Sequence, residues 1–175
     1  IKRLAKTKDL SIDLTSMYNK MSSDIEMVQV TNPNNPTGLT LSPEDLRLFC
    51  KKASKKAIVL IDEAYNELTS DPDENTMIPL INEGYNVVVA RTFSKIYGLA
   101  GMRVGYMIAD PELISKISSF GLGDYSLNQA GVAAAIASYN DEKFLRYSKE
   151  KIIEARDMLR DACLLYTSDA ADDLV

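Results

Sequence analysis

The sequence predicts an α/β fold of three layers, in which helices flank a mostly parallel sheet. Short apolar runs alternate with helical patterns along the chain, which is typical of such a sheet. Two runs, Ala57–Ile61 and Val87–Val89, are continuously apolar, as expected of strands buried on both faces. With 175 residues, 46% of them hydrophobic, the chain is long enough to form a core.

The strands and helices follow from local signals. Four strands are expected: Met27–Thr31, Ala57–Ile61, Asn86–Arg91 and Val104–Ile108. Ser42 and Asp110 each precede a proline, and this pairing marks the start of a helix. After Asp110, the spacing of Leu113, Ile114 and Ile117 predicts a buried helical stripe.

The remaining part of the chain is expected to be helical. Asn128–Tyr139 is rich in alanine, which predicts a closely packed helix, and Asp141 is a candidate cap for a long one. The apolar spacing of that long helix is lost over residues 163–175, where we expect a frayed tail.

Composition excludes several classes of protein. A net charge of −5 and a pI near 4.8 argue against a nucleic-acid partner. No run approaches the ~20 apolar residues that a membrane crossing requires.

The chain has no histidine, so His-dependent triads are excluded and no metal site is expected. Cys50 and Cys163 have neither metal-site nor redox spacing, and two unmatched thiols favour a reducing, cytoplasmic location.

Polar clusters follow the first three expected strands, where open α/β sheets bind ligands. Asn35 follows the first strand, Asp62 and Tyr65 the second, and Lys95 the third. Because burial disfavours a charged amine, a lysine at a strand end is a candidate for imine chemistry. Each residue alone also has an ordinary interpretation, as part of a turn, a helix-capping aspartate or a solvated lysine.

A fourth cluster, Gly98–Gly105, precedes the last strand. Its small residues allow close backbone approach, and Arg103 offers a guanidinium suited to phosphate. The glycine spacing differs from both G-x-G-x-x-G and the Walker A loop, and the chain contains no Gly-Lys dipeptide. Together the four clusters supply the groups that suit a phosphorylated, aldehyde-bearing pyridine.

Three motifs resemble those of pyridoxal-phosphate-dependent aminotransferases of fold type I, class I/II, above all the histidinol-phosphate aminotransferase-like branch. They are N-P-N-N-P-T-G (32–38), D-E-A-Y (62–65) and R-T-F-S-K-I-Y-G-L-A-G-M-R-V-G-Y (91–106). The resemblance implies an incomplete large domain over residues 1–140. It also implies a helix leading to the small domain over 141–162 and a tail of doubtful origin over 163–175.

The resemblance implies a role for each candidate site residue. Lys95 matches the lysine that forms an imine with pyridoxal 5'-phosphate and later shuttles a proton. Asp62 matches the carboxylate that pairs with the pyridine nitrogen. Asn35 and Tyr65 match the pair that hydrogen-bonds the phenolic oxygen, and Lys95, Asp62 and Tyr65 are the expected catalytic residues. The expected phosphate ligands are Thr92, Ser94 and Arg103.

The implied activity is transamination between an amino acid, histidinol phosphate among the candidates, and a 2-oxo acid such as 2-oxoglutarate, in a homodimer. A decarboxylase of a phosphorylated amino acid and a non-catalytic binding module are the alternatives. The family's first half of the phosphate cup, ring-stacking aromatic residue and C-terminal carboxylate-binding arginine are not in this chain, so we expect the fragment alone to be inactive. The segment Gly123–Asn128 lacks the proline and first asparagine usual in the branch, which leaves the amino donor open.

Overall fold

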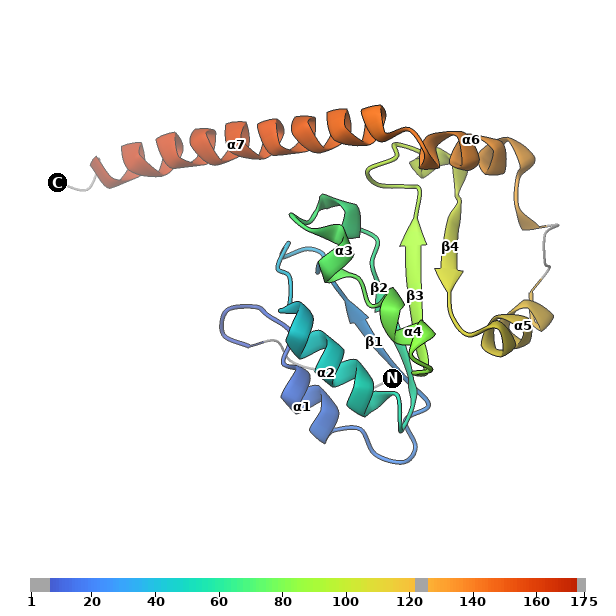
Figure 1. Cartoon of the computed structure of the whole chain (residues 1–175). Coiled ribbons are helices and arrows are strands. Elements are labelled where there is room, and N and C mark those ends of the chain that lie inside the picture. The colour runs from blue at the N-terminus through green and yellow to red at the C-terminus, as the bar shows by residue number, and fades with distance from the viewer. Residues whose placement is uncertain (1–6, 122–125, 173–175) are drawn as a thin grey trace.

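The computed structural model describes residues 7–121 and 126–172, with their side chains up to residue 164. The described residues form a four-stranded sheet with the strand order β1-β2-β3-β4 (Figure 1). Its strands are β1 (Met27–Thr31), β2 (Ile58–Asp62), β3 (Val87–Thr92) and β4 (Gly105–Ile108). β1, β2 and β3 are parallel, and β4 is antiparallel to β3. The predicted α/β fold with a mostly parallel sheet is confirmed, and each strand lies within one residue of its expected bounds.

The helices that the capping signals predicted begin at the expected residues. The described helices are α1 (Leu14–Asn19), α2 (Pro43–Ala53), α3 (Pro72–Asn75), α4 (Ile78–Asn82), α5 (Pro111–Ser119), α6 (Gln129–Tyr139) and α7 (Glu142–Asp172), with 3₁₀ turns η1 (Asn66–Leu68) and η2 (Ala100–Met102). The Ser42 hydroxyl accepts a hydrogen bond from the backbone N–H of Asp45 at 3.3 Å, and the Asp110 carboxylate accepts one from Glu112 at 2.9 Å. Both predicted caps are therefore confirmed.

The main core lies on one face of the sheet, under α2 and α4. The strand side chains that pack there alternate along each strand: Val28, Val30, Val59, Ile61, Val87 and Val89. On β3 the intervening Val88 is also buried, at 3% exposure, whereas Leu60 on β2 is half-buried and Met27 on β1 is 55% exposed. Burial on both faces is therefore confirmed for β3 and wrong for β2 within the described chain.

The apolar stripe predicted for α5 is not buried. Leu113 and Ile114 are half-buried, and Ile117 is 37% exposed. Figure 1 shows α5 beyond β4 and away from α2 and α4, so its apolar side chains keep access to solvent.

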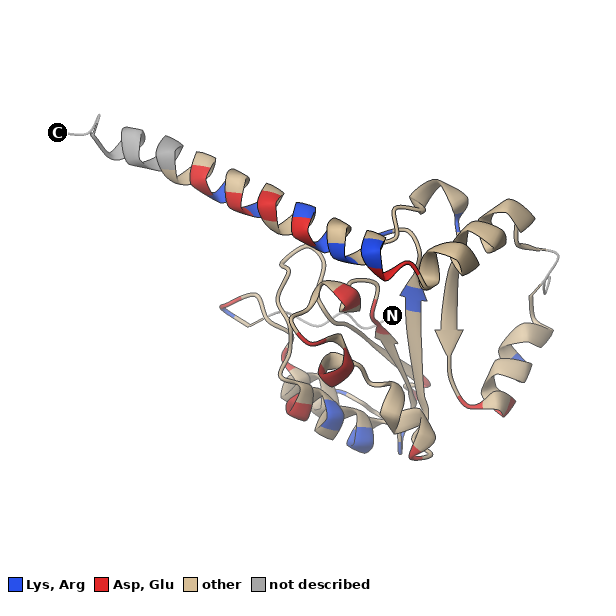
Figure 2. Ribbon diagram, turned by 45° about the horizontal axis from the view of Figure 1, so that its top comes forward, with Lys and Arg blue, Asp and Glu red and all other residues tan. Residues whose placement is uncertain are grey.

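The long helix α7 extends away from the sheet (Figure 1) and carries charged residues of both signs along its length (Figure 2). It begins after Asp141, whose carboxylate accepts a hydrogen bond from the backbone N–H of Phe144 at 2.9 Å, as predicted. The backbone is helical to Asp172, past the point where we expected fraying. The division at residues 140 and 162 stays a prediction. None of the described helices is long and apolar enough to cross a membrane.

Candidate active site

The topology brings the four predicted polar clusters to one edge of the sheet. Thr31 pairs with Asp62, and Asp62 pairs with Ala90, so the segments that follow the three parallel strands begin at the same level. Because β4 is antiparallel, its first residue Gly105 pairs with Thr92 at the end of β3. The cluster that precedes β4 therefore reaches the same edge as the clusters that follow the other strands.

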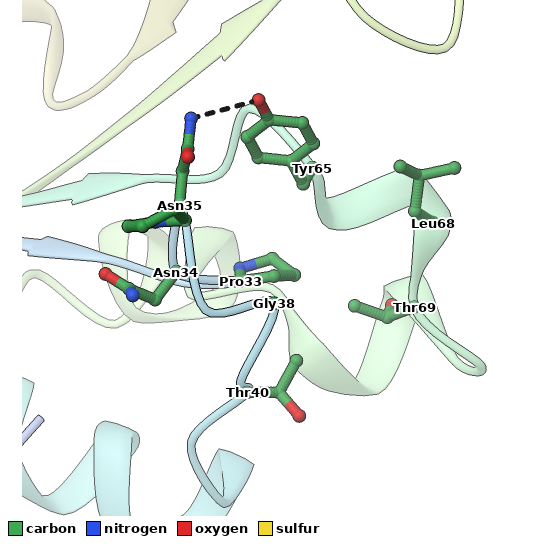
Figure 3. A pocket seen from close by; sticks show the side chains of 9 residues that line it. Pro33, Asn34, Asn35, Gly38, Thr40, Tyr65, Leu68 and Thr69 are labelled. Carbon is green, nitrogen blue, oxygen red and sulfur yellow. Dashed lines mark hydrogen bonds between the residues drawn. The ribbon is translucent and has the colours of Figure 1, made fainter. Parts of the chain in front are cut away.

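Three candidate residues lie together at this edge. The Nδ2 of Asn35 donates a hydrogen bond to the hydroxyl of Tyr65 at 3.3 Å (Figure 3). The Nζ of Lys95 lies over the Tyr65 ring, 5.2 Å from its centroid. The Lys95 side chain is exposed, so the desolvation we expected there is not present in the described chain. Asn35 and Tyr65 also border an open cavity of about 350 Å³.

Asp62 is the last residue of β2 and is half-buried. Its carboxylate accepts a hydrogen bond from the backbone N–H of Ala64 at 3.1 Å, which orders the turn after the strand. Since Ile61 faces the core under α2 and α4, Asp62 lies on the opposite face of the sheet. Thr92 lies on this same face, because Arg91 points to the core side.

Of the three predicted phosphate ligands, Thr92 is the last residue of β3, and Ser94 and Arg103 lie on the segment that joins β3 to β4. The Thr92 hydroxyl accepts a hydrogen bond from the backbone N–H of Ser94 at 3.0 Å and donates one to the Val104 carbonyl at 3.5 Å. Arg103 has a left-handed backbone with φ of 54° and an exposed side chain. Its Nη1 donates to the carbonyl of Ala100 at 2.9 Å, which holds the guanidinium close to η2.

A cluster of aromatic side chains anchors the loop that carries Lys95. The ring of Phe93 lies 4.9 Å from that of Tyr97, 5.6 Å from that of Tyr106 and 6.4 Å from that of Tyr139, between centroids. Phe93 and Tyr97 are buried, and burial raises the pKa of both the Tyr97 and Tyr106 hydroxyls. The loop is therefore fixed on both sides of Lys95 while the amine itself faces solvent.

Sequence reasoning missed a buried ion pair beneath the site. Glu63 is fully buried and accepts hydrogen bonds from Arg91, at 3.1 Å from Nε and 2.8 Å from Nη2. It also accepts from the hydroxyl of Thr76 and, at 2.7 Å, from the backbone N–H of Met77. Burial lowers the pKa of Arg91, but the nearby carboxylates outweigh burial and raise it above its ordinary value. Strand alternation could have indicated that the residue after Asp62 faces the core.

The segment that precedes α6 is described only in part. The segment Gly123–Tyr125, on which the comparison with the histidinol-phosphate branch partly depends, lies outside the described residues. Asn128 caps α6 by accepting a hydrogen bond from the backbone N–H of Gly131 at 2.6 Å. The described residues contain no group of three or more His, Cys, Asp or Glu side chains that could hold a metal ion.

The fold and the position of the candidate residues define a class of protein. It is an α/β protein whose polar side chains gather beyond the carboxyl ends of parallel strands, where such sheets bind ligands. The family model for aminotransferase class I and II matches residues 2–168. The chain therefore belongs to the class I and II aminotransferase family.

Curated relatives include histidinol-phosphate aminotransferases. Histidinol-phosphate aminotransferase 1 of Cupriavidus pinatubonensis is 37% identical over 147 residues, which are 84% of this chain and 39% of the relative. The Bacillus subtilis histidinol-phosphate aminotransferase is 37% identical over 145 residues, or 83% of this chain and 40% of the relative. The chain thus spans about two fifths of the length of these relatives.

Solved structures agree with this family assignment. The histidinol-phosphate aminotransferase of Sinorhizobium meliloti, in complex with pyridoxal-5'-phosphate, has a TM-score of 0.77 and 30% identity, with 88% of this chain and 41% of that chain covered. The L-threonine-O-3-phosphate decarboxylase of Porphyromonas gingivalis has a TM-score of 0.62 at 22% identity, over 73% of this chain and 38% of that chain. The decarboxylase therefore shares the fold.

Proposed function

We propose that the protein containing this chain is a pyridoxal-phosphate-dependent aminotransferase that transfers an amino group from an amino acid to a 2-oxo acid. Family membership supports the reaction class. The observation that carries the proposal is the grouping of Lys95, Tyr65 and Asn35 at the carboxyl edge of the sheet. We propose histidinol phosphate as the amino donor, because relatives at 37% identity carry that name, and 2-oxoglutarate as the acceptor.

The side chains at the edge fit the cofactor group by group. Lys95 supplies an amine for its aldehyde, and Asp62 supplies a carboxylate for its pyridine nitrogen. Asn35 and Tyr65 supply two neighbouring donors for the phenolic oxygen. The phosphate would be held by Arg103 and by the hydroxyls of the β3 loop. When bound, the cofactor supplies a ring that stabilises negative charge on the α-carbon of the substrate.

Each side chain then has a defined task. The negative charge of Asp62 would keep a proton on the pyridine nitrogen, which would make the ring a stronger electron acceptor. The amide of Asn35 and the hydroxyl of Tyr65 orient the ring through its phenolic oxygen. The amine of Lys95 would bind the aldehyde group of the cofactor, and as a free amine it would move a proton at the substrate α-carbon, as a general base and acid.

The test is Lys95→Ala in the complete protein, with Lys116→Ala on α5 as the control. Lys116 is an exposed lysine outside the site. We expect Lys95→Ala to lose the absorbance of covalently attached cofactor and to slow transamination by at least about 10²-fold, while Lys116→Ala keeps both. Wild-type turnover in Lys95→Ala would contradict the assignment.

The products decide between transamination and the decarboxylation alternative. Formation of a 2-oxo acid from the amino donor, with a matching amount of amino acid from 2-oxoglutarate, supports the aminotransferase. Release of CO₂ without a 2-oxo acid would instead support a decarboxylase.

We further propose that the complete protein is a cytoplasmic homodimer and that residues 1–175 alone are inactive. Family membership implies an active site at a dimer interface. Light scattering of the complete protein measures its molecular mass and so tests whether it is a dimer. The two cysteines, which are not joined in a disulfide, are compatible with a reducing compartment. Robust turnover by the purified 175-residue chain would contradict its proposed inactivity.

A further inference from the structure

Three buried asparagines connect the loop that carries Asn35 to the turn that carries Tyr65. Asn32 and Asn66 are each 1% exposed, and Asn75 is 6% exposed. Asn32 lies three residues before Asn35, and Asn66 directly follows Tyr65. Asn75 is the last residue of α3 and joins the other two. We call these three residues the asparagine relay.

The amides of the relay form one directed chain of hydrogen bonds. The Nδ2 of Asn32 donates to the Oδ1 of Asn75 at 3.2 Å, and the Nδ2 of Asn75 donates to the Oδ1 of Asn66 at 2.7 Å. At one end, the backbone N–H of Leu41 donates to the Oδ1 of Asn32 at 2.9 Å. At the other end, the Nδ2 of Asn66 donates to the Pro72 carbonyl at 3.0 Å. Every amide in the relay thus uses both its oxygen and its nitrogen.

Backbone hydrogen bonds fix both ends of the relay to the residues at the carboxyl end of β2. The N–H of Asn32 donates to the carbonyl of Asp62 at 3.0 Å, so the loop after β1 starts from a position set by β2. The N–H of Asn66 donates to the carbonyl of Glu63 at 3.0 Å, which closes the turn that includes Tyr65. The loop and the turn are therefore each held next to β2. The side-chain hydrogen bonds of the relay add a second connection between them.

Stability alone gives little reason for such a relay. Replacing all members of a buried polar network by apolar side chains of the same shape can be nearly neutral for folding. A fully hydrogen-bonded polar network instead specifies one arrangement of the segments it joins, because any other spacing leaves buried polar groups unpaired.

We propose that Asn32, Asn66 and Asn75 are positioning residues that hold Asn35 and Tyr65 at hydrogen-bond distance and thereby set how strongly the pair donates to the phenolic oxygen of the cofactor. The cofactor part of this inference rests on the proposed function. The spacing of Asn35 and Tyr65 rests on the geometry of this chain alone.

The experiment replaces the middle amide, which hydrogen-bonds to Asn32 and Asn66 rather than to the site residues. Asn75→Leu is compared with Leu46→Val, a substitution on the buried face of α2 that weakens packing without changing the relay. Both variants are made in the complete protein. Asn75→Ser, whose hydroxyl can keep one hydrogen bond, is used if Asn75→Leu does not fold, with a smaller effect expected in the same direction.

The first measurement is the pH midpoint of the absorbance change of bound pyridoxal 5'-phosphate. Donors to the phenolic oxygen favour its ionised form, so a misaligned Asn35–Tyr65 pair should raise this midpoint by about 0.5 pH unit or more. The second measurement needs no cofactor: the side-chain amide NMR signal of Asn35 in asparagine-labelled protein should move in Asn75→Leu. Neither quantity should change in Leu46→Val, although its denaturation midpoint falls.

The outcomes separate the two proposals. An Asn75→Leu protein that keeps both the absorbance midpoint and the Asn35 signal of the parent overturns the positioning role, whatever its stability. If the parent itself attaches no pyridoxal 5'-phosphate, the proposed function fails, and the Asn35 signal in the cofactor-free protein still decides whether the relay positions the pair.

Discussion

The guanidinium of Arg91 donates two hydrogen bonds to the buried carboxylate of Glu63, which joins the ends of β3 and β2 inside the protein. Glu63 directly follows Asp62, and Arg91 directly precedes Thr92. Because successive residues of a strand point to opposite faces, the ion pair lies on the core side and Asp62 and Thr92 lie on the other. The pair therefore fixes the relative position of the two strand ends beneath the candidate site.

Arg91→Met should strongly destabilise the protein, because it leaves Glu63 with a buried charge and no cationic partner. The Glu63 side chain is 1% exposed, and breaking such a buried pair costs about 3–5 kcal/mol. Urea denaturation measures this loss. The control is Arg156→Met on α7, where the ion pair with Asp157 is exposed and a change within about 1 kcal/mol is expected. Equal losses of unfolding free energy in the two variants would show that the buried Arg91–Glu63 pair stabilises the protein no more than an exposed pair does.

Glu67 gives a pH-dependent prediction at the same network. Burial raises the pKa of Glu67 above its ordinary value, although Arg91, 3.5 Å away, acts in the opposite direction. A raised pKa in the folded state means that ionised Glu67 costs stability at neutral pH. This cost disappears as the pH falls through the folded-state pKa towards the unfolded value near 4.5.

Glu67→Gln removes that ionisation, so it should raise the free energy of unfolding at pH 7. The gain over the parent should shrink as the pH is lowered towards 4.5. Denaturant titrations of both proteins across this range provide the measurement. A gain that stays constant, or grows, at low pH would show that Glu67 does not titrate as inferred.

The strands could be predicted from sequence because β-branched runs such as Val87–Val89 combine strand propensity with burial. The site edge was predictable for a topological reason: carboxyl ends of parallel strands meet at one edge, so the segments that carry Asn35, Asp62 and Lys95 had to reach the same edge of the sheet. The contacts that hold this edge were not predictable, because Glu63 and Arg91 are 28 positions apart and carry no local signal of pairing.

Local signals were also overlooked or misleading. Asp71-Pro72 is the same cap-and-proline signal as Ser42-Pro43, and the Asp71 carboxylate does accept a hydrogen bond from the backbone N–H of Glu74 at 3.0 Å, yet α3 was not predicted. The stripe of α5 has a helical period, but a period shows which residues share a face and not whether another element covers that face.

Cys50 should be unreactive in the folded protein. Its thiol is buried in the core, and burial raises its pKa to about 12. At pH 8 roughly one thiol in ten thousand would be ionised, and the thiolate is the reactive form. In a Cys163→Ser background, we expect a colorimetric thiol reagent to label Cys50 only after denaturant is added. Rapid labelling of the native protein would show that the core around α2 opens readily.

Gly131 on α6 sets the distance between this helix and the segment that carries Arg103. A Cβ at Gly131 would lie 2.8 Å from both Val104 Cγ2 and Asn128 Nδ2, and 3.0 Å from the Met102 carbonyl oxygen. The same Asn128 Nδ2 donates a hydrogen bond to that carbonyl at 2.9 Å, so the added methyl group would displace the contact that fixes the residue before Arg103.

Gly131→Ala should therefore destabilise the protein by about 1–3 kcal/mol, the usual cost of overpacking. It should also weaken binding of pyridoxal 5'-phosphate by the complete protein, because Arg103 is the proposed phosphate ligand. Gly101→Ala is the matched control: a Cβ there meets nothing within 4 Å, so a change within about 0.5 kcal/mol is expected. Denaturation and cofactor titration of both variants separate the two effects. Gly131→Ala that is destabilised but binds the cofactor like the parent would show that Arg103 does not depend on the packing of α6.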